Sequence, residues 1–207
     1  MSMDVTSSAG GLYLKNVWLW TADHNVEDPN LTQNTVYAGR GLYIESTSGN
    51  IWLYGAAAEH HGFYQFQLAN TKNVYLGQIQ TETPYYQSNP DATVPFTAVS
   101  SLSDPTFTAT KGSNTANAWG LRILNSTGAF IYDAGLYSFY NNYDTGCGNP
   151  GNGEACQKRV FDVSDSTISV YNLNTVGVSD TITVDGVDEA LYSDNLNGYI
   201  DTVALFR

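Results

Sequence analysis

Basic residues are scarce in this chain. Only 8 of its 207 residues are Lys or Arg, against 20 Asp and Glu, which gives a formal net charge of -12 at neutral pH. A surface of this sign repels phosphate backbones and anionic lipid headgroups. We therefore expect neither nucleic acid nor a membrane as a partner.

Long apolar runs are missing as well. No stretch approaches the roughly 20 apolar residues that a membrane-spanning helix needs. Residues 1–10 carry neither the basic segment nor the apolar segment of a secretory signal. Two locations stay open: the cytoplasm if Met1 is the native first residue, and secretion if a signal peptide has been removed.

Cysteine is nearly absent. Cys147 and Cys156 are the only two, and they flank a loop rich in Gly and Asn. This short spacing predicts a local disulfide, which would stabilise the fold by about 2–3 kcal/mol. The alternative is a pair of reduced thiols, because the sequence does not establish a redox compartment.

Short runs with a period of two fill the rest of the chain. Charged residues make up only 14% of it, whereas it contains 15 Tyr and 19 Gly. Alternating apolar residues that end at Asn, Ser, Thr or Gly turns predict strands. These runs are 12–20, 41–46, 50–54, 64–68, 73–77, 121–124, 129–132, 160–163 and 167–171.

Repetition of this unit, with no amphipathic helix between strands, predicts an all-β solenoid. We expect one domain over 1–207, a single-stranded right-handed parallel β-helix with a flexible N-terminus at 1–11. A β-sandwich is the alternative fold. Two long insertions, about 22–40 and 83–118, either wall a functional cleft or cover an edge.

Seven strings from residue 16 to residue 178 carry a resemblance to a known family. They are NVWLWTADH (16–24), GRGLYIES (39–46), WLYGAAAEHH (52–61), YQFQLANTKNVYLGQIQTETPYYQ (64–87), AWGLRI (118–123), GLYSFYNNY (135–143) and VYNLNTVGV (170–178). In this order they resemble the C-terminal half of the fungal glycoside hydrolase family 55 β-1,3-glucanases. The resemblance implies two tandem β-helices with a cleft between them, and sugar release with inversion. This chain matches only the second β-helix.

Inverting hydrolysis needs a carboxylic acid and a second group that activates water, roughly 6.5–9.5 Å apart. The resemblance implies that Glu59 is the acid. It also implies that the groups orienting the water lie in the first β-helix. This chain would then lack half of the hydrolytic groups.

The residues around Glu59 allow a similar interpretation without the resemblance. A partly buried carboxyl beside His60 and His61 suits proton transfer, and a hydrogen-bonded turn carboxylate is the alternative. Adjacent histidines on a strand point to opposite faces, and no third ligand is spaced nearby. We therefore expect no metal site and no cofactor.

Aromatic and amide side chains supply the predicted substrate contacts, because flat rings stack on ring-shaped ligands. The alternative for each is a place in the core. Asp23 and His24 are interpreted as loop structure, because adjacent side chains rarely meet. The predicted substrate-binding residues are Trp18, Trp20, Tyr54, Tyr64, Gln65, Glu82, Tyr85, Tyr86 and Tyr140.

Three functions follow from these features. The first is a non-hydrolytic enzyme of fungal secondary metabolism, a cofactor-free cyclase or hetero-Diels–Alderase that orients a small molecule. The second is an exo-β-1,3-glucan hydrolase fragment or glucan-binding module. The third is a structural module that self-associates, with a homodimer forming through the face that packs on the first β-helix in the family.

Overall fold

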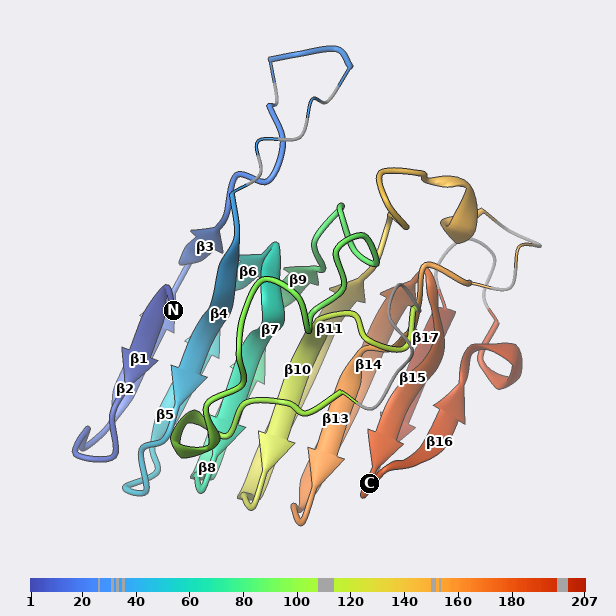
Figure 1. Cartoon of the computed structure of the whole chain (residues 1–207). Helices are drawn as coiled ribbons and strands as arrows, with labels where there is room; N and C mark the ends of the chain where they lie inside the picture. The colour runs from blue at the N-terminus through green and yellow to red at the C-terminus, as the bar shows by residue number, and fades with distance from the viewer. Residues whose placement is uncertain are drawn as a thin grey trace.

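The structure is a computed structural model that describes residues 1–25, 27–30, 32, 34, 36–107, 114–149, 152, 154–196 and 201–207. Strands stack in parallel into coils, as the repeated alternating runs predict (Figure 1). Two curved sheets result, one of eight strands and one of nine. The parallel β-helix expected from the sequence is therefore confirmed.

Each early coil contains three strands in sequence order. The first coil is β1 (Met3–Val5), β2 (Leu12–Lys15) and β3 (Trp18–Trp20); the second is β4 (Ala38–Ile44), β5 (Ile51–Tyr54) and β6 (Ala57–Glu59); the third is β7 (His61–Ala69), β8 (Lys72–Gly77) and β9 (Gln80–Glu82).

Later coils merge the second and third strands into one. They comprise β10 (Trp119–Leu124), β11 (Thr127–Tyr137), β12 (Gln157–Arg159), β13 (Phe161–Ser164), β14 (Ile168–Val176) and β15 (Val178–Val184). Two antiparallel strands close the C-terminal end: β16 (Val187–Leu191) pairs with β15, and β17 (Asp201–Phe206) pairs with β14. The described helices are the short 3-10 turns η1 (Ser100–Leu102), η2 (Gly146–Gly148) and η3 (Tyr192–Asp194), and none of them could cross a membrane.

Alternation and register build the core. Leu53, Leu76 and Ile131 are register partners on successive strands and are fully buried inside the coil. Asparagine makes the corners: Asn70 (φ 59°) and Asn125 (φ 45°) both adopt the left-handed conformation, which Asn tolerates better than most residues. Their amides also join across coils, because Asn125 Nδ2 donates to Asn70 Oδ1 at 2.7 Å. These asparagine corners explain the polar turns seen in the sequence.

The first residues of the chain pair with the sheet, whereas the sequence led us to expect a flexible segment at 1–11, which stays a prediction for the remaining residues. Met3–Val5 pairs in parallel with β4, and the Ser2 amide donates to the Arg40 carbonyl at 2.9 Å. These ladder hydrogen bonds hold the segment in place.

Three insertions leave the β-helix from the same corner. Residues 21–37 follow β3, residues 83–118 follow β9, and residues 138–156 follow β11 (Figure 1). The first is shorter than predicted, because Ala38 and Arg40 already pair with β7. The third was not recognised as an insertion from the sequence. All three emerge where the third strand of a coil ends, so they gather around one site.

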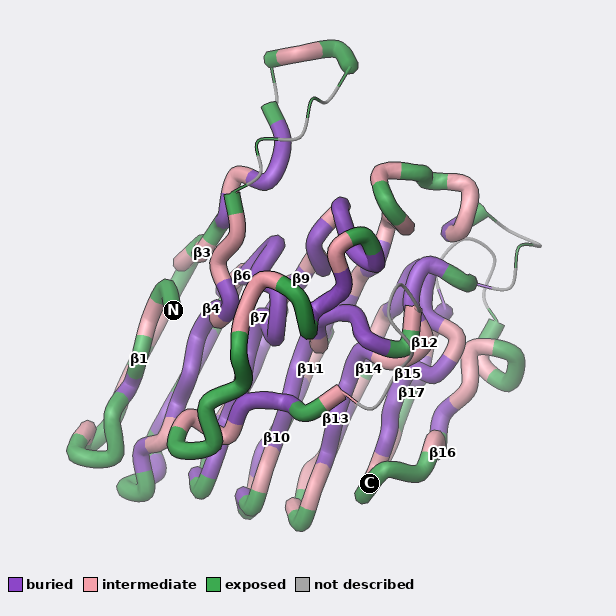
Figure 2. The backbone as a smooth tube through the Cα atoms, viewed as in Figure 1, coloured by how far each residue is buried: buried purple, intermediate pink, exposed green. Residues whose placement is uncertain are grey.

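The second insertion covers the outer face of the eight-stranded sheet. Gln67 Nε2 donates to the Leu102 carbonyl at 2.8 Å, and Arg122 Nη1 donates to the Ser103 carbonyl at 2.8 Å. Every residue of β7 is consequently buried (Figure 2).

Candidate active site

Two carboxylates lie side by side at the corner where the insertions emerge. Glu59 ends β6 and Glu82 ends β9, and the two are register partners on neighbouring parallel strands. Trp20 at the end of β3 flanks Glu59, and Tyr137 at the end of β11 flanks Glu82. One oxygen of each carboxylate lies within 4.8 Å of the other and of a His60 ring nitrogen. The row of four therefore points outward together.

A second outward row lies two residues earlier on the same strands. Trp18 in this row is 60% exposed, and its ring stacks on Trp20 with centroids 5.3 Å apart. At the other end of the row, the Tyr137 ring lies over Gly135, since a Cβ there would come within 2.5 Å of the Tyr137 hydroxyl. The two rows thus have exposed indole rings at one end and the Tyr137 ring, lying over Gly135, at the other.

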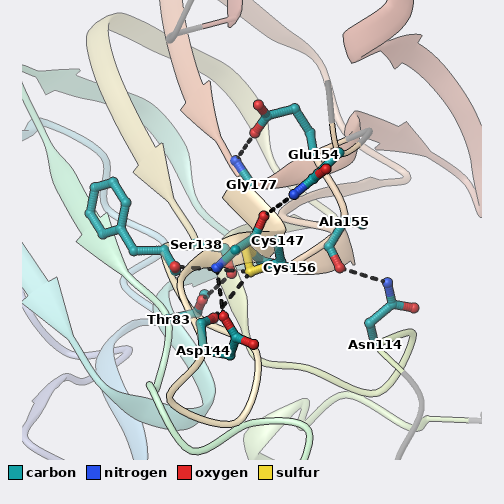
Figure 3. Close-up of a disulfide and its surroundings, with 12 residues drawn as sticks. Thr83, Asn114, Ser138, Asp144, Cys147, Glu154, Ala155, Cys156 and Gly177 are labelled. Carbon is teal, nitrogen blue, oxygen red and sulfur yellow. Dashed lines mark hydrogen bonds between the residues drawn. A yellow bond between two sulfur atoms is a disulfide. The ribbon is translucent and has the colours of Figure 1, made fainter. Parts of the chain in front are cut away.

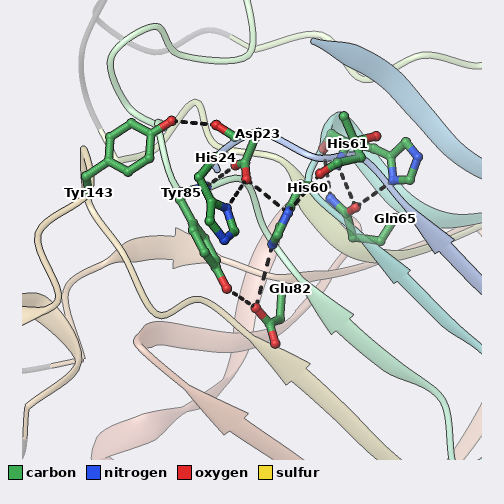
Figure 4. A network of polar contacts seen from close by, with 9 residues as sticks. Asp23, His24, His60, His61, Gln65, Glu82, Tyr85 and Tyr143 are labelled. Atoms are coloured by element: carbon green, nitrogen blue, oxygen red, sulfur yellow. Dashed lines mark hydrogen bonds and ion pairs between the residues drawn. The ribbon is translucent and has the colours of Figure 1, made fainter. Parts of the chain in front are cut away.

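His60 reaches this row because it breaks the strand alternation. Its φ of 65° places it at the corner between β6 and β7. Nδ1 lies 3.0 Å from the Thr21 carbonyl and 3.1 Å from Asp23 Oδ1, whereas Nε2 lies 3.6 Å from Glu82 Oε2 (Figure 4). That last distance is an ion-pair contact, and Nε2 has no hydrogen-bond partner among the described residues.

Asp23 is a candidate site residue that sequence reasoning interpreted as loop structure only. Its carboxylate contacts the neighbouring His24 Nδ1 at 2.8 Å, so the assumption that adjacent side chains do not meet is wrong here. The Tyr85 amide donates to Asp23 Oδ2, and the Tyr143 hydroxyl donates to the Asp23 carbonyl, each at 3.0 Å (Figure 4). One buried aspartate therefore joins His60 to all three insertions. No local sequence signal reveals these contacts, because each partner comes from a different loop.

The surroundings shift the pKa values of the two glutamates in opposite directions. Burial raises the pKa of Glu59 above its ordinary value, and the negative charge of Glu82 raises it further. Burial also acts to raise the pKa of Glu82, but the ion-pair contact with His60 and the hydrogen bond from Tyr85 outweigh it and lower this pKa. Glu59 is the group of the pair that keeps its proton to higher pH.

His60 supplies positive charge to this pair. Burial acts to lower its pKa, but its contacts with Asp23 and Glu82 raise the pKa to about 9. The pKa of Asp23 ends below its ordinary value, because the hydrogen bonds and charge of His60 outweigh burial. At neutral pH, His60 is therefore a cation held between two carboxylates.

A pocket of about 410 Å³ adjoins Glu82. The Tyr85 hydroxyl donates to Glu82 Oε2 at 2.6 Å, and the Tyr85 and Tyr140 ring centroids are 3.9 Å apart. The lining residues are Glu82, Tyr85, Phe139, Tyr140, Thr145, Gly148 and Asn149. Most of this wall belongs to the third insertion.

A disulfide between Cys147 and Cys156 holds that wall (Figure 3). Cys147 lies in η2 beside the lining residue Gly148, whereas Cys156 is fully buried at the start of β12. The Ala155 amide also donates to the Cys147 carbonyl at 3.1 Å. The disulfide thus ties the outer wall of the pocket to the β-helix.

The structure brings together most of the predicted site. The residues gathered at this corner are Trp18, Trp20, Glu59, His60, Glu82, Tyr85 and Tyr140. His61 is not among them. It begins β7, where it is fully buried and contacts Gln65 and Ser2, and burial lowers its pKa to about 4.

Four further predicted contacts lie away from the corner or inside the protein. Tyr64, Gln65 and Tyr86 are fully buried, so the core alternative describes where they lie. Tyr54 is exposed, but it lies on β5, whose outer face is separate from the corner.

The argument against a third metal ligand does not hold. Two groups, Asp23 with His24 and His60, and Glu59 with His60 and Glu82, each place three ligand atoms within 4.8 Å of one another. Folding brings these residues together from different coils, which spacing along the chain does not reveal. The observed contacts within both groups are hydrogen bonds and ion pairs that explain the paired geometry without an ion.

Fold and site together define a class: a parallel β-helix whose paired carboxylates lie beside an aromatic-walled pocket. The chain is 40% identical over 206 residues, 98% of its length, to a glucan 1,3-beta-glucosidase of Cochliobolus carbonum, and covers 25% of that protein. It is 43% identical over its full length to a probable glucan endo-1,3-beta-glucosidase of Arthroderma benhamiae, covering 23%. No protein-family model matches the chain.

A third relative has a different name. The non-secreted LysM effector LysM15 of Penicillium expansum is 37% identical over 201 residues, which are 95% of this chain and 13% of the effector. The chain thus spans a quarter or less of the length of these curated relatives. The resemblance to fungal β-1,3-glucanases is confirmed at the level of a region of such proteins, and two of the three names favour a glucan over a cyclase substrate.

Proposed function

We propose that this chain is a glucan-processing module that binds a β-1,3-glucan at the Glu59–Glu82 corner and protonates the glycosidic oxygen. The observation that carries the proposal is the adjacent pair of carboxylates with opposite pKa shifts, beside an aromatic pocket. Two carboxyl groups with divided protonation states are the usual requirement for glycoside hydrolysis.

Glu59 is the proton donor in this proposal, because its pKa is raised and a protonated carboxyl is what the leaving oxygen needs. Glu82 is too close to be the water-activating partner of an inverting enzyme. Their nearest oxygens lie within 4.8 Å, whereas that partner stands roughly 6.5–9.5 Å away. Glu82 instead keeps Glu59 protonated through its charge.

His60 and Asp23 are positioning residues. His60 keeps Glu82 ionised, and Asp23 fixes the orientation of the His60 ring through Nδ1. The His60 Nε2 atom faces Glu82 and is itself buried, so in this proposal it acts on the Glu82 carboxylate and not directly on the sugar. The protonation of Glu59 therefore depends on the contacts among His60, Asp23 and Glu82, which are already formed without substrate.

Aromatic rings supply the sugar contacts. Trp18 and Trp20 are exposed on one side of the carboxylates, and Tyr85 and Tyr140 wall the pocket on the other. The pocket volume of about 410 Å³ falls within the range of roughly 300–1,000 Å³ that small-molecule sites occupy. Tyrosine and tryptophan combine a flat apolar face with a polar tip, which matches a neutral pyranose.

The test is sugar release from β-1,3-glucan oligosaccharides by the chain and its Glu59→Gln variant. Release by the chain is expected to be slow, since it supplies only the acid. Glu59→Gln is expected to lower it at least about 100-fold, the usual contribution of general acid catalysis. The loss should be much smaller for an aryl glucoside whose leaving group needs no proton.

Glu189→Gln is the matched control, because Glu189 is exposed on β16 away from the site. It should retain the rate of the unmodified chain. Equal rates for the chain and Glu59→Gln would contradict the proposal, and so would a chain that releases no sugar.

A further inference from the structure

A bare aromatic face lies on the nine-stranded sheet, around the coil from the carboxylates. Its outward positions form two rows across consecutive coils. The first row is Tyr13, Trp52, Tyr75, Phe130 and Ser169, and the second is Lys15, Tyr54, Gly77, Tyr132 and Tyr171. Seven of these ten register-matched positions are aromatic, and we call these seven residues the aromatic face.

Several of these rings are unusually exposed for their size. Tyr13 is 63% exposed, Trp52 45% and Phe130 43%. Large exposed apolar patches are rare on globular proteins and commonly mark binding surfaces. The outer face of the eight-stranded sheet is covered by the insertion at 83–107, whereas the rings on the nine-stranded sheet are exposed.

Charge limits what this face binds. The chain carries 20 Asp and Glu, yet none occupies the ten positions of the two rows, whose one charged residue is Lys15 at the end of the second row. The ring tips are hydroxyls and an indole N–H, which donate and accept hydrogen bonds without charge. A neutral ligand rich in hydroxyl groups and C–H faces meets both conditions.

Repetition indicates a polymer. Neighbouring strands are spaced by about 4.8 Å, which is close to the length of one pyranose unit. Rings also continue from coil to coil: Tyr75 lies 5.5 Å from Tyr132, and Tyr132 lies 4.6 Å from Tyr171. A regular array of this kind suits a chain of repeating sugar rings better than the irregular surface of a globular partner.

We infer that the aromatic face is a second binding site for β-glucan, which holds the polymer while its end occupies the Glu59–Glu82 corner. The ligand class rests on the proposed function. Strand β11 runs from the aromatic face to the corner, since Phe130 and Tyr132 lie near its start and Tyr137, the register partner of Glu82, ends it. The same sheet therefore carries both sites.

The experiment is co-sedimentation with insoluble β-1,3-glucan, using the Glu59→Gln chain so that the polymer is not degraded. Trp52→Ala together with Phe130→Ala on this background should weaken binding at least about tenfold, the usual effect of removing aromatic stacking partners. Val187→Ala is the matched control, because Val187 is an exposed apolar residue outside the aromatic face. It should bind like its parent.

Three results would overturn the inference. The first is a Glu59→Gln parent that does not sediment with the polymer, and the second is a double variant that binds the polymer within twofold of the parent. The third is a concentration-dependent dimer of the parent that the double substitution abolishes and that the polymer does not dissociate. Failure of the proposed function looks different. A chain that releases no sugar but binds the polymer through Trp52 and Phe130 would keep this second site and lose the catalytic one.

Discussion

The two sheets of the β-helix treat their outer faces in opposite ways. The insertion at 83–107 covers the eight-stranded sheet and buries charge, including Arg122 against Asp162. The nine-stranded sheet leaves aromatic rings in solvent, among them Tyr13, Trp52 and Phe130. Buried charges on the covered face need oppositely charged partners. The aromatic rings on the bare face need no such partners and are accessible to a ligand.

The largest expected effect tests the covered face. Arg122→Met removes the guanidinium that contacts Asp162, Gln67 and the Ser103 carbonyl. Because Asp162 then lies buried without a cation, the free energy of unfolding should fall by about 3–5 kcal/mol. Urea denaturation measures this. A fall of less than about 1 kcal/mol would contradict a buried ion pair under the insertion. As a control, the Arg122→Met, Asp162→Asn double variant should recover part of the lost free energy of unfolding.

A second effect concerns the pocket wall that the disulfide holds at the corner. Cys147→Ser with Cys156→Ser should lower the free energy of unfolding by about 2–3 kcal/mol, because the short ring constrains the unfolded chain. The same change frees the pocket wall at Gly148 and should weaken binding of short glucan oligosaccharides in calorimetry. Unchanged oligosaccharide affinity would mean that the wall does not contact the sugar.

The pH dependence of stability tests the buried network at the corner. The pKa of His60 is raised from 6.5 to about 9, so its contribution is complete below about pH 6.5 and is lost as the pH rises through 9. The free energy of unfolding should therefore fall between pH 7 and 9.5. Above that range, the buried tyrosines with raised pKa add their own contributions.

His60→Gln should flatten this slope, which denaturation at several pH values measures. The lowered pKa of Asp23 acts in the opposite range, because its contribution is lost as the pH falls below its ordinary titration. A variant with the same slope as the unmodified chain between pH 7 and 9.5 would show that His60 is not held as a cation.

The smallest effect belongs to the aromatic face. Tyr132→Leu removes stacking with Tyr75 and Tyr171 but keeps an apolar side chain in the row. Thermal unfolding should show a loss of about 0.5–1.5 kcal/mol. A loss as large as that of Arg122→Met would mean that the aromatic face is structural in the same sense as the covered face.

Local pattern predicted most of the fold, because alternation and asparagine corners act within a few residues. The family resemblance singled out Glu59, whereas Glu82 and the tryptophans were chosen because they lie on or beside predicted aromatic strands; their roles stay predictions. The contacts of Asp23 were not predictable. They depend on the left-handed turn at His60 and on three loops that meet only after the coils have stacked. Burial of Tyr64 and Tyr86 could not be predicted either, because the period of a strand does not reveal a covering loop.

The interpretation as a cyclase rested on what this chain lacks compared with the family. The names of two relatives favour a glucan instead, and the comparisons give the cyclase interpretation no support. Self-association and the homodimer remain predictions. They become measurable through the aromatic face, because the sedimentation experiment separates a dimer from a bound polymer.

Indole N–H spectra offer the most direct test of the account, because the four tryptophans report on separate regions. Trp18 and Trp20 lie beside Glu59, Trp52 lies on the aromatic face, and Trp119 packs under the covering insertion. A short β-1,3-glucan oligosaccharide should shift the Trp18 and Trp20 signals first, and longer chains should also shift Trp52, while Trp119 stays unchanged. Signals that all stay in place, or that shift only at Trp119, would contradict a glucan site at this corner.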